Sequence, residues 1–238
     1  MKQTWRWFGP HDTITTADMR QCGVEGVVSA LHHISPGQVW PVDEISARQA
    51  AIAKMPDGSP SGLAWDVVES LPVSETIKTK GSDYAAHVAA YKESLRNLAA
   101  CGLEVVCYNF MPILDWTRTD LHRRMEHGGT AMSFDLLDFA VFDLHILGRS
   151  GAADDYSTDF AAQAAARFAA LSAEAAAQLQ TNIVAGLPGA NDNWSIDDVR
   201  AHLSTYAFID AHDLYVNLID FLAEVTPLAQ ELGLRLCC

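Results

Sequence analysis

A continuous apolar run that opens into a polar, aromatic loop places the strongest constraint on this chain. Residues 105–111 read Val-Val-Cys-Tyr-Asn-Phe-Met, and the residues that follow, up to Leu121, add Asp, Trp and Arg side chains. Such a run is typical of a strand that is covered on both faces, as in a parallel sheet. Parallel barrels carry their functional sites in the loops at the carboxyl ends of their strands. We therefore expect a buried parallel strand here, with a functional site at its end.

Strand-like and helical segments alternate through the first part of the chain. The helical segments have apolar residues at helical spacing or carry start signals, such as the hydroxyl group of Thr15 with an acidic residue, Asp18, three positions later. This alternation predicts an α/β fold, with a parallel sheet and crossover helices. The expected strands are residues 4–8, 24–31, 63–71 and 103–111, and the expected helices begin at Thr15 and span residues 42–54 and 82–101.

The pattern changes between residues 119 and 212, where alanine- and leucine-rich segments indicate a helical excursion. A parallel barrel with only five strands would leave two unpaired edges. We therefore interpret residues 1–238 as a single partial barrel domain that is completed by polypeptide outside this sequence. The expected elements are helices over residues 134–147, 159–183 and 213–232, a helix capped by Ser195, and a fifth strand over residues 234–238.

The acidic balance of the chain limits the classes of partner. The 30 Asp and Glu residues exceed the 16 Lys and Arg residues and give a formal net charge of -14 at pH 7. Such a field repels nucleic acid and anionic membranes, so we expect neither as a partner. The N-terminus lacks the apolar segment of a signal peptide, and no run of about 18 apolar residues occurs. We expect a cytoplasmic protein whose five cysteines are reduced and mostly buried. The sequence does not decide whether the protein forms a homo-oligomer.

Six stretches spread along the chain form a specific combination. The longest is residues 106–120, Val-Cys-Tyr-Asn-Phe-Met-Pro-Ile-Leu-Asp-Trp-Thr-Arg-Thr-Asp. The others are residues 4–10 (Thr-Trp-Arg-Trp-Phe-Gly-Pro), 26–33 (Gly-Val-Val-Ser-Ala-Leu-His-His), 67–73 (Val-Val-Glu-Ser-Leu-Pro-Val), 77–78 (Ile-Lys) and 182–189 (Asn-Ile-Val-Ala-Gly-Leu-Pro-Gly). With these stretches the chain resembles the mannonate dehydratase family from its first residues to its last.

The resemblance implies a TIM-type (β/α)8 barrel of the xylose-isomerase-like kind, of which this chain holds about five of the eight strands. It also implies a divalent metal, Mn2+ or Fe2+, and the removal of water from D-mannonate to give 2-dehydro-3-deoxy-D-gluconate in hexuronate (glucuronate) catabolism. In the family the fifth strand continues into a His-Pro-Asp-Asp motif, where the metal ligands begin. We therefore expect the ligands beyond Cys238, assign none to this chain, and expect it to be inactive alone. Residues 56–62, rich in Pro and Gly, depart from the family pattern as a surface loop.

Substrate-binding residues are expected at the carboxyl ends of the strands. His33 follows the second strand, and we favour it over His32 as the inward-pointing histidine. Its row on the strand contains Val27, Ser29 and Leu31. The alternative for either histidine is a structural role, bonded to a loop carbonyl. Glu69 ends the third strand as a carboxylate in an apolar run, and its burial needs a partner or a purpose. The alternative for Glu69 is a salt bridge to a neighbouring helix.

The fourth strand and its loop supply further candidates. Asn109 can bind substrate hydroxyl groups as donor and acceptor. Arg118 can bind a sugar-acid carboxylate through two parallel hydrogen bonds, and Trp116 can pack on the carbon chain. The alternative for Asp115 and Arg118 is an ion pair that stabilises the loop. Trp7, after the first strand, is a candidate pocket wall, although a Trp in a short strand is more often core. The general acid and base stay unassigned.

Two other functions stay open from the sequence. Sugar isomerases and epimerases on the same barrel also use a divalent metal to stabilise an enediolate, so the product formed would distinguish them from a dehydratase. A non-catalytic fragment or binding protein is the second alternative. We expect this alternative if the gene ends at Cys238.

Overall fold

The computed structural model describes residues 1–114, 116–185 and 194–238. These residues form two compact units. Unit 1 comprises residues 1–112 and 208–238, and unit 2 comprises the described residues between 113 and 207. In the part of the chain that the structure describes, no helix has both the length and the apolar character needed to cross a membrane. The interpretation of residues 1–238 as one partial barrel domain, with an excursion over residues 119–212, stays a prediction.

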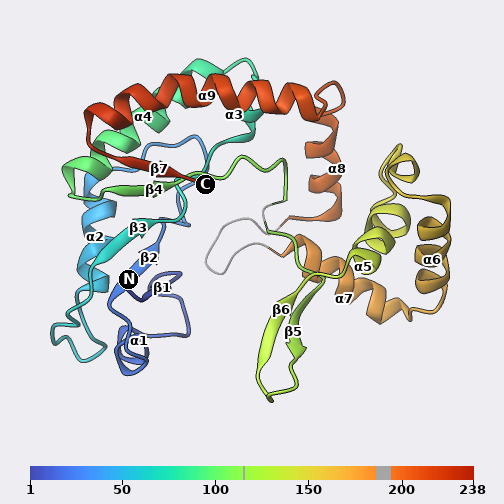
Figure 1. The fold of residues 1–238 in the computed structure, drawn as a ribbon, viewed down its shortest axis with the longest axis horizontal. Coiled ribbons are helices and arrows are strands. Elements are labelled where there is room, and N and C mark those ends of the chain that lie inside the picture. Colours follow the sequence, from blue (N-terminus) through green and yellow to red (C-terminus); the bar gives the residue numbers. More distant parts are fainter. Residues whose placement is uncertain (115, 186–193) are drawn as a thin grey trace. The chain divides into compact units, whose positions relative to one another are not determined.

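Unit 1 is built on a five-stranded sheet in which all neighbouring strands are parallel (Figure 1). The strand order β1-β2-β3-β4-β7 confirms the α/β fold with a parallel sheet that the alternation predicted. The expected fifth strand, β7, pairs with β4 and places Leu236 opposite Val106. Each strand is shorter than the segment that predicted it. The bounds are β1 Thr4–Arg6, β2 Gly26–Ser29, β3 Trp65–Val68, β4 Val105–Cys107 and β7 Arg235–Cys237.

Helices cover one face of this sheet, and local sequence signals mark their ends (Figure 1). Thr15 caps α1 as predicted, because its hydroxyl accepts a hydrogen bond from the Asp18 amide and the Asp18 carboxylate accepts one from the Thr15 amide. α4 and α9 end shortly before Gly102 and Gly233, whose φ angles of 78° and 71° suit glycine. The short helix α3 was not expected. The bounds are α1 Thr16–Gln21, α2 Val42–Ile52, α3 Glu75–Lys78, α4 Tyr84–Ala100 and α9 Ala211–Glu231.

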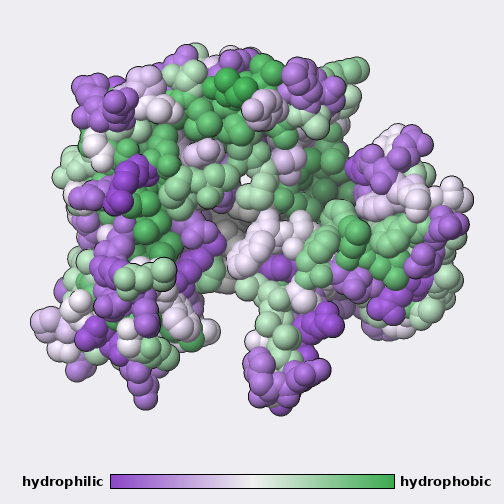
Figure 2. Space-filling model, viewed as in Figure 1, coloured by the Kyte–Doolittle hydropathy of each residue, from purple (hydrophilic) through white to green (hydrophobic). Residues whose placement is uncertain are grey.

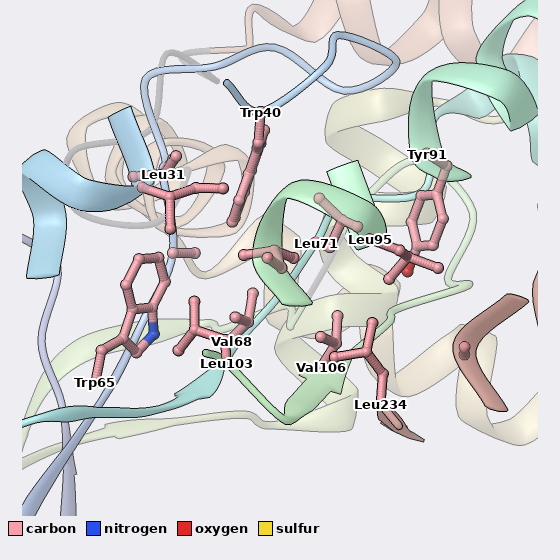
Figure 3. Packing of buried hydrophobic residues seen from close by; sticks show 14 of the residues in the cluster. Leu31, Trp40, Trp65, Val68, Leu71, Tyr91, Leu95, Leu103, Val106 and Leu234 are labelled. Carbon is pink, nitrogen blue, oxygen red and sulfur yellow. The ribbon is translucent and has the colours of Figure 1, made fainter. Parts of the chain in front are cut away.

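The core of unit 1 lies between the sheet and these helices (Figure 3). Val68 of β3 and Val106 of β4 are 0% exposed and pack in one cluster with Leu95 of α4 and Phe221 of α9. Burial of an apolar side chain of this size stabilises the fold by roughly 1.5–3 kcal/mol. Because side chains alternate along a strand, the other row of each strand points to the opposite face of the sheet. That less buried face carries the polar residues of the candidate site.

Unit 2 begins with an antiparallel hairpin, in which Arg124 lies opposite Thr130. The structure differs here from the expected helical excursion. The hairpin strands, β5 Asp120–Arg124 and β6 Thr130–Ser133, are mostly polar and exposed, so they lack the apolar alternation from which strands are predicted. The turn contains Gly128 at a φ of 91°. Hydrophilic side chains gather at the tip of this hairpin (Figure 2).

The rest of the described part of unit 2 is helical, and one of the expected helices is divided into two. Residues 159–183 were expected as one helix, and this is wrong: the side chain of Ser172 accepts a hydrogen bond from the Ala175 amide and begins a second helix. Ser195 caps a further helix together with Asp198, as predicted. The bounds are α5 Leu136–Val141, a π-helical segment Phe142–Leu147, a 3-10 helical turn Ala152–Asp155, α6 Thr158–Ala169, α7 Ala173–Val184 and α8 Ile196–Thr205.

A buried carboxylate links three segments of unit 2. Asp143 is 3% exposed and accepts hydrogen bonds from Nε and Nη2 of Arg149 at 2.9 and 2.8 Å and from the Tyr156 hydroxyl at 3.1 Å. A buried charge is tolerated when it is paired and hydrogen-bonded, and both conditions hold here. Burial, with the adjacent Asp143 carboxylate, raises the pKa of Tyr156 to about 12, so the hydroxyl keeps its proton and donates it to the bond.

We expect Asp143→Asn to destabilise unit 2 strongly. Removing one partner of a buried pair costs roughly 3–5 kcal/mol, and we expect a value near the lower limit because Arg149 is partly solvated and keeps a second partner. That partner is Asp155, 2.6 Å from Nη2 of Arg149. The measurement is hydrogen exchange of the amides in α5, α6 and α7 in rising concentrations of urea.

Asp197→Asn is the matched control, since this carboxylate pairs with Arg200 but its side chain is 85% exposed. Exposed pairs contribute about 0–1 kcal/mol, so little change is expected. Equal losses of stability in the two variants would contradict a structural role for the buried carboxylate.

Candidate functional site

Polar side chains from three strands meet where those strands end. Nη1 of Arg6, on β1, donates a hydrogen bond to Oε1 of Glu69, directly after β3, at 3.0 Å. Nδ2 of Asn109, shortly after β4, donates to Oγ of Ser70 at 3.1 Å. These four residues are called the strand-end group below. The structure thus places two predicted site residues, Glu69 and Asn109, at the same edge of one sheet, where parallel strands carry functional groups.

Arg6 was not among the predicted site residues, although its position next to Trp7 in the first strand indicates which face of the sheet it occupies. Neighbouring residues of a strand point to opposite faces. Trp7 lies in the core at 5% exposure, where its indole Nε1 donates to the carbonyl of Ile14 at 2.9 Å. Arg6 therefore points to the other face, and its guanidinium lies over the ring of Phe8, 5.3 Å from the ring centre. The position of Trp7 matches the core alternative, and its role as a pocket wall stays a prediction.

His32 packs close to the strand-end group. Its ring centre is 5.5 Å from that of Phe8. Neither ring nitrogen makes a hydrogen bond of ordinary geometry with a described residue, although the Phe8 carbonyl is near enough to favour the charged form. Burial, strengthened by repulsion from the guanidinium groups of Arg48 and Arg6, lowers the pKa of His32 to about 4. The ring is therefore uncharged at neutral pH.

His33 lies in a different environment from its neighbour. Its side chain is 49% exposed, and Nε2 is 3.0 Å from Oε2 of Glu44 on α2. The structure differs from the expectation that His33 points inward with Val27 and Leu31, because those two residues are buried against the helices. This contact resembles the structural alternative for His33, except that the partner is a helix carboxylate and not a loop carbonyl. The substrate-binding role of His33 stays a prediction.

A hollow of about 410 Å³ opens in unit 1 beside both histidines. Arg48 of α2 lines it and is 7% exposed. Nη1 of Arg48 donates to Oγ of Ser29 and to the carbonyl of Ala30, at 2.7 Å in each case. Burial lowers the pKa of Arg48, while Glu44 opposes the change. These bonds fix the chain after β2, which leads to His32.

Trp116 and Arg118 belong to unit 2. Arg118 is 5% exposed, and its Nη2 donates to the carbonyl of Ala185 at 2.7 Å. Its guanidinium also lies 5.6 Å from the ring centre of Trp116, which is 50% exposed. Arg118 thus holds the chain within unit 2, and the predicted roles of both residues toward a substrate stay predictions. Asp115 lies outside the described residues.

The described residues do not fit a metal site. Within residues 1–114, 116–185 and 194–238, no three His, Cys, Asp or Glu side chains are grouped so that they could hold a metal ion. A divalent cation needs several such ligands at one point. The described side chains therefore do not supply the ligands of the metal that the resemblance implies.

The cysteines are free, but they are less buried than expected. Cys22 and Cys238 are exposed, and Cys101, Cys107 and Cys237 are partly buried. The expectation of mostly buried thiols is wrong, because two of the five side chains are exposed and the other three are only partly buried.

The chain matches the profile of one protein family, D-mannonate dehydratase (UxuA), over residues 1–238. It is 52% identical over 237 residues to mannonate dehydratase 1 of Agrobacterium fabrum (strain C58 / ATCC 33970) and 49% identical over 237 residues to a mannonate dehydratase of Rhizobium meliloti (strain 1021). Both matches cover 100% of this chain, which spans 58% of the length of either relative. The crystal structure of mannonate dehydratase from Streptococcus suis serotype 2 matches with a TM-score of 0.67 at 27% identity, covering 100% of this chain and 52% of that one.

We expect His32→Gln to remove part of the acid sensitivity of the protein. The pKa of His32 is about 4 in the folded protein against 6.5 for an exposed histidine, so below pH 6.5 only the unfolded chain takes up the proton. The stability that the neutral ring provides is complete above pH 6.5 and is lost as the pH falls toward 4, by at most about 1.4 kcal/mol per pH unit. Urea unfolding at several pH values between 7 and 4 measures it.

His33→Gln serves as the control, because the side chain of His33 is half exposed. We expect this variant to follow the pH dependence of the unmodified protein, while the His32 variant shows a shallower one. The same slope in all three proteins would mean that His32 is not kept neutral by burial.

Proposed function

Since the chain belongs to the D-mannonate dehydratase family, we propose that it forms the substrate-binding part of an enzyme that removes water from D-mannonate to give 2-dehydro-3-deoxy-D-gluconate. The strand-end group supports this proposal. It offers carboxylate, amide and hydroxyl groups at the carboxyl ends of parallel strands, where barrel enzymes bind their substrates. A sugar acid presents a row of hydroxyl groups, each of which donates to an acceptor oxygen and accepts from an N–H donor.

Glu69 is the residue of this group that we assign to direct substrate contact. Its Oε1 is held by Arg6, while Oε2 has no hydrogen-bond partner among the described residues and the side chain is 37% exposed. The bond from Arg6 orders the carboxylate in advance, so less side-chain freedom is lost on binding. In this proposal Oε2 accepts a hydrogen bond from a substrate hydroxyl group.

Asn109 and His32 supply neutral contacts in this proposal. The Asn109 amide, which donates to Oγ of Ser70, is the group that this proposal assigns to a substrate hydroxyl group, as donor and acceptor. His32 has a pKa of about 4, which makes it a weak base at neutral pH, so we assign it a hydrogen bond to substrate and not the removal of a proton. The other proposed substrate-binding residues are Trp7, His33, Trp116 and Arg118.

We also propose that the sheet of unit 1 belongs to a TIM-type (β/α)8 barrel. β1 and β7 each have one edge without a partner strand in the described part of the chain, and closure of a barrel pairs such edges. Dependence on Mn2+ or Fe2+ is proposed for the dehydration reaction, with ligands outside the described residues. The proposed location is the cytoplasm, and a homo-oligomer is compatible with this proposal.

We expect Glu69→Gln to lower kcat/KM for D-mannonate by about 10- to 100-fold in a chain that continues past Cys238 to the length of its relatives. A hydrogen bond to a charged group is worth roughly 1.5–3 kcal/mol, and about 1.4 kcal/mol corresponds to a factor of ten. Asn109→Ala should cause a smaller loss, since its bonds are neutral. The measurement follows the formation of the keto-deoxy acid by NMR, with Mn2+ or Fe2+ added.

Glu104→Gln is the matched control. This glutamate lies just before β4, at the opposite end of the strand from Asn109, and its side chain is 73% exposed. The Glu104→Gln variant should have the same kcat/KM for D-mannonate as the unmodified protein. A ketose or an epimer as the product would favour an isomerase or epimerase instead, and no turnover of D-mannonate by the metal-supplied protein would refute the proposed reaction.

A further inference from the structure

A buried guanidinium of unit 1 lacks a counter-ion. Arg48 of α2 is 7% exposed and forms no ion pair with a carboxylate of the described residues, although Glu44 is near enough to influence its charge. Its two hydrogen bonds, to the Ser29 hydroxyl and the Ala30 carbonyl, both come from Nη1 and go to uncharged groups. A guanidinium stays charged in proteins, and a buried charge is costly unless an opposite charge pairs with it. The surroundings of Arg48 therefore favour the binding of an anion.

Two nitrogens of this guanidinium are available to a ligand. Nε and Nη2 of Arg48 make no hydrogen bond with a described residue. Neither belongs to the described side-chain nitrogens that are both fully buried and unpartnered, so each keeps contact with solvent. The hollow of about 410 Å³ is the opening that Arg48 lines. Neighbouring N–H groups of a guanidinium bind two oxygens of one carboxylate or phosphate group through parallel hydrogen bonds.

The loop between β1 and α1 holds the guanidinium in place. A Cβ atom at Gly9 would lie 2.7 Å from Nη2 and 2.9 Å from Nη1 of Arg48, so the loop can approach this closely only with glycine. The φ angle of Gly9, 102°, also suits glycine. The guanidinium carbon lies 5.7 Å from the ring centre of Trp7. Because these contacts and the bonds from Nη1 fix the group in advance, little side-chain freedom is lost when a ligand binds.

The charge of the lining differs from that of the whole chain. The chain has 30 Asp and Glu residues against 16 Lys and Arg residues. Among the described residues that line the hollow, Glu44 is the one carboxylate, against Arg48 and the three histidines His11, His32 and His33. Oε2 of Glu44 is engaged by Nε2 of His33 at 3.0 Å. The lining therefore accepts an anion more readily than the acidic surface of the molecule does.

We propose that this hollow binds a small oxyanion, with Nε and Nη2 of Arg48 donating to two oxygens of one carboxylate or phosphate group. The bound anion supplies the negative charge that no described carboxylate brings to Arg48. Inorganic phosphate and the carboxylate of a sugar acid share this chemistry, and adding each in turn separates them. The proposal rests on the charge and geometry of the hollow, so it does not depend on the proposed dehydration.

The experiment follows the Nε–H resonance of Arg48 by NMR in protein labelled with [15N]arginine. Sodium phosphate replaces sodium chloride at constant ionic strength, and D-mannonate replaces chloride in a second titration. The resonance should move to a saturating limit, because a hydrogen bond to a charged oxygen changes the environment of the Nε proton. A shift with phosphate alone identifies a free oxyanion as the ligand, and a shift with D-mannonate identifies a sugar-acid carboxylate. Arg48→Lys assigns the resonance, which should be absent from its spectrum.

Ala47→Glu tests the hollow without removing Arg48. Ala47 lies on α2, is exposed and lines the hollow, so a carboxylate at this position competes for the guanidinium. The anion concentration at half of the full shift should rise by at least about 10-fold, because the ligand loses charge-assisted hydrogen bonds. Ala50→Glu is the matched control, since Ala50 is an exposed alanine of the same helix that is not among the lining residues. This control variant should titrate like the unmodified protein.

Urea unfolding gives an independent result if Arg48→Lys does not fold. An anion that binds only the folded protein stabilises it, so the anion should protect Ala50→Glu more than Ala47→Glu. General exclusion of phosphate from protein surfaces affects these two variants equally, because they have the same composition and charge. An Arg48 resonance that neither anion moves beyond the effect of chloride, or equal effects of the anion in the two glutamate variants, overturns the proposal.

Discussion

Parallel pairing of β3 with β2 on one side and β4 on the other is the constraint on which the candidate site depends. Val68 lies opposite Ser29 of β2 and Val106 of β4, so the end of β3 is fixed against both neighbours. The pairing continues past the strand, where the amide of Glu69 donates to the carbonyl of Ser29 at 2.9 Å. Because all these strands run in one direction, Arg6 and Glu69 meet at the same edge although 63 residues separate them in the sequence.

The alternation of side chains along each strand then decides what each residue can do. Trp7 enters the core beside the helices, whereas Arg6, one position earlier, points to the other face and binds Glu69. His32 and His33 differ in the same way. The side chain of His32 is partly buried beside two guanidinium groups, which lowers its pKa, whereas His33 is exposed and contacts a helix carboxylate. Adjacent residues of one type therefore have different chemistry because they face different surroundings.

The order of strands and helices in unit 1 could be predicted because two kinds of signal agree there. Apolar runs mark the strands, and hydroxyl caps and glycines mark the ends of the helices, as at Thr15, Gly102 and Gly233. The sequence of the unit 2 hairpin contains no apolar runs that would mark its two strands. Its strands are mostly polar and exposed, and their pairing rests on backbone hydrogen bonds that any sequence can form. The break at Ser172 was missed because the alanine-rich composition around it favours helix on both sides.

The candidate site could be predicted only in part, for a related reason. Glu69 and Asn109 stand out because they are polar residues directly after apolar strands, so their position in the sequence alone marks them. The choice between Arg6 and Trp7, or between His32 and His33, requires knowing which row of a strand faces the helices. In the strand segments of this chain, such as residues 26–31, apolar residues occupy both rows, so hydrophobicity does not distinguish them. The packing of α2 and α4 against one row decides it, and that packing involves residues far away in the chain.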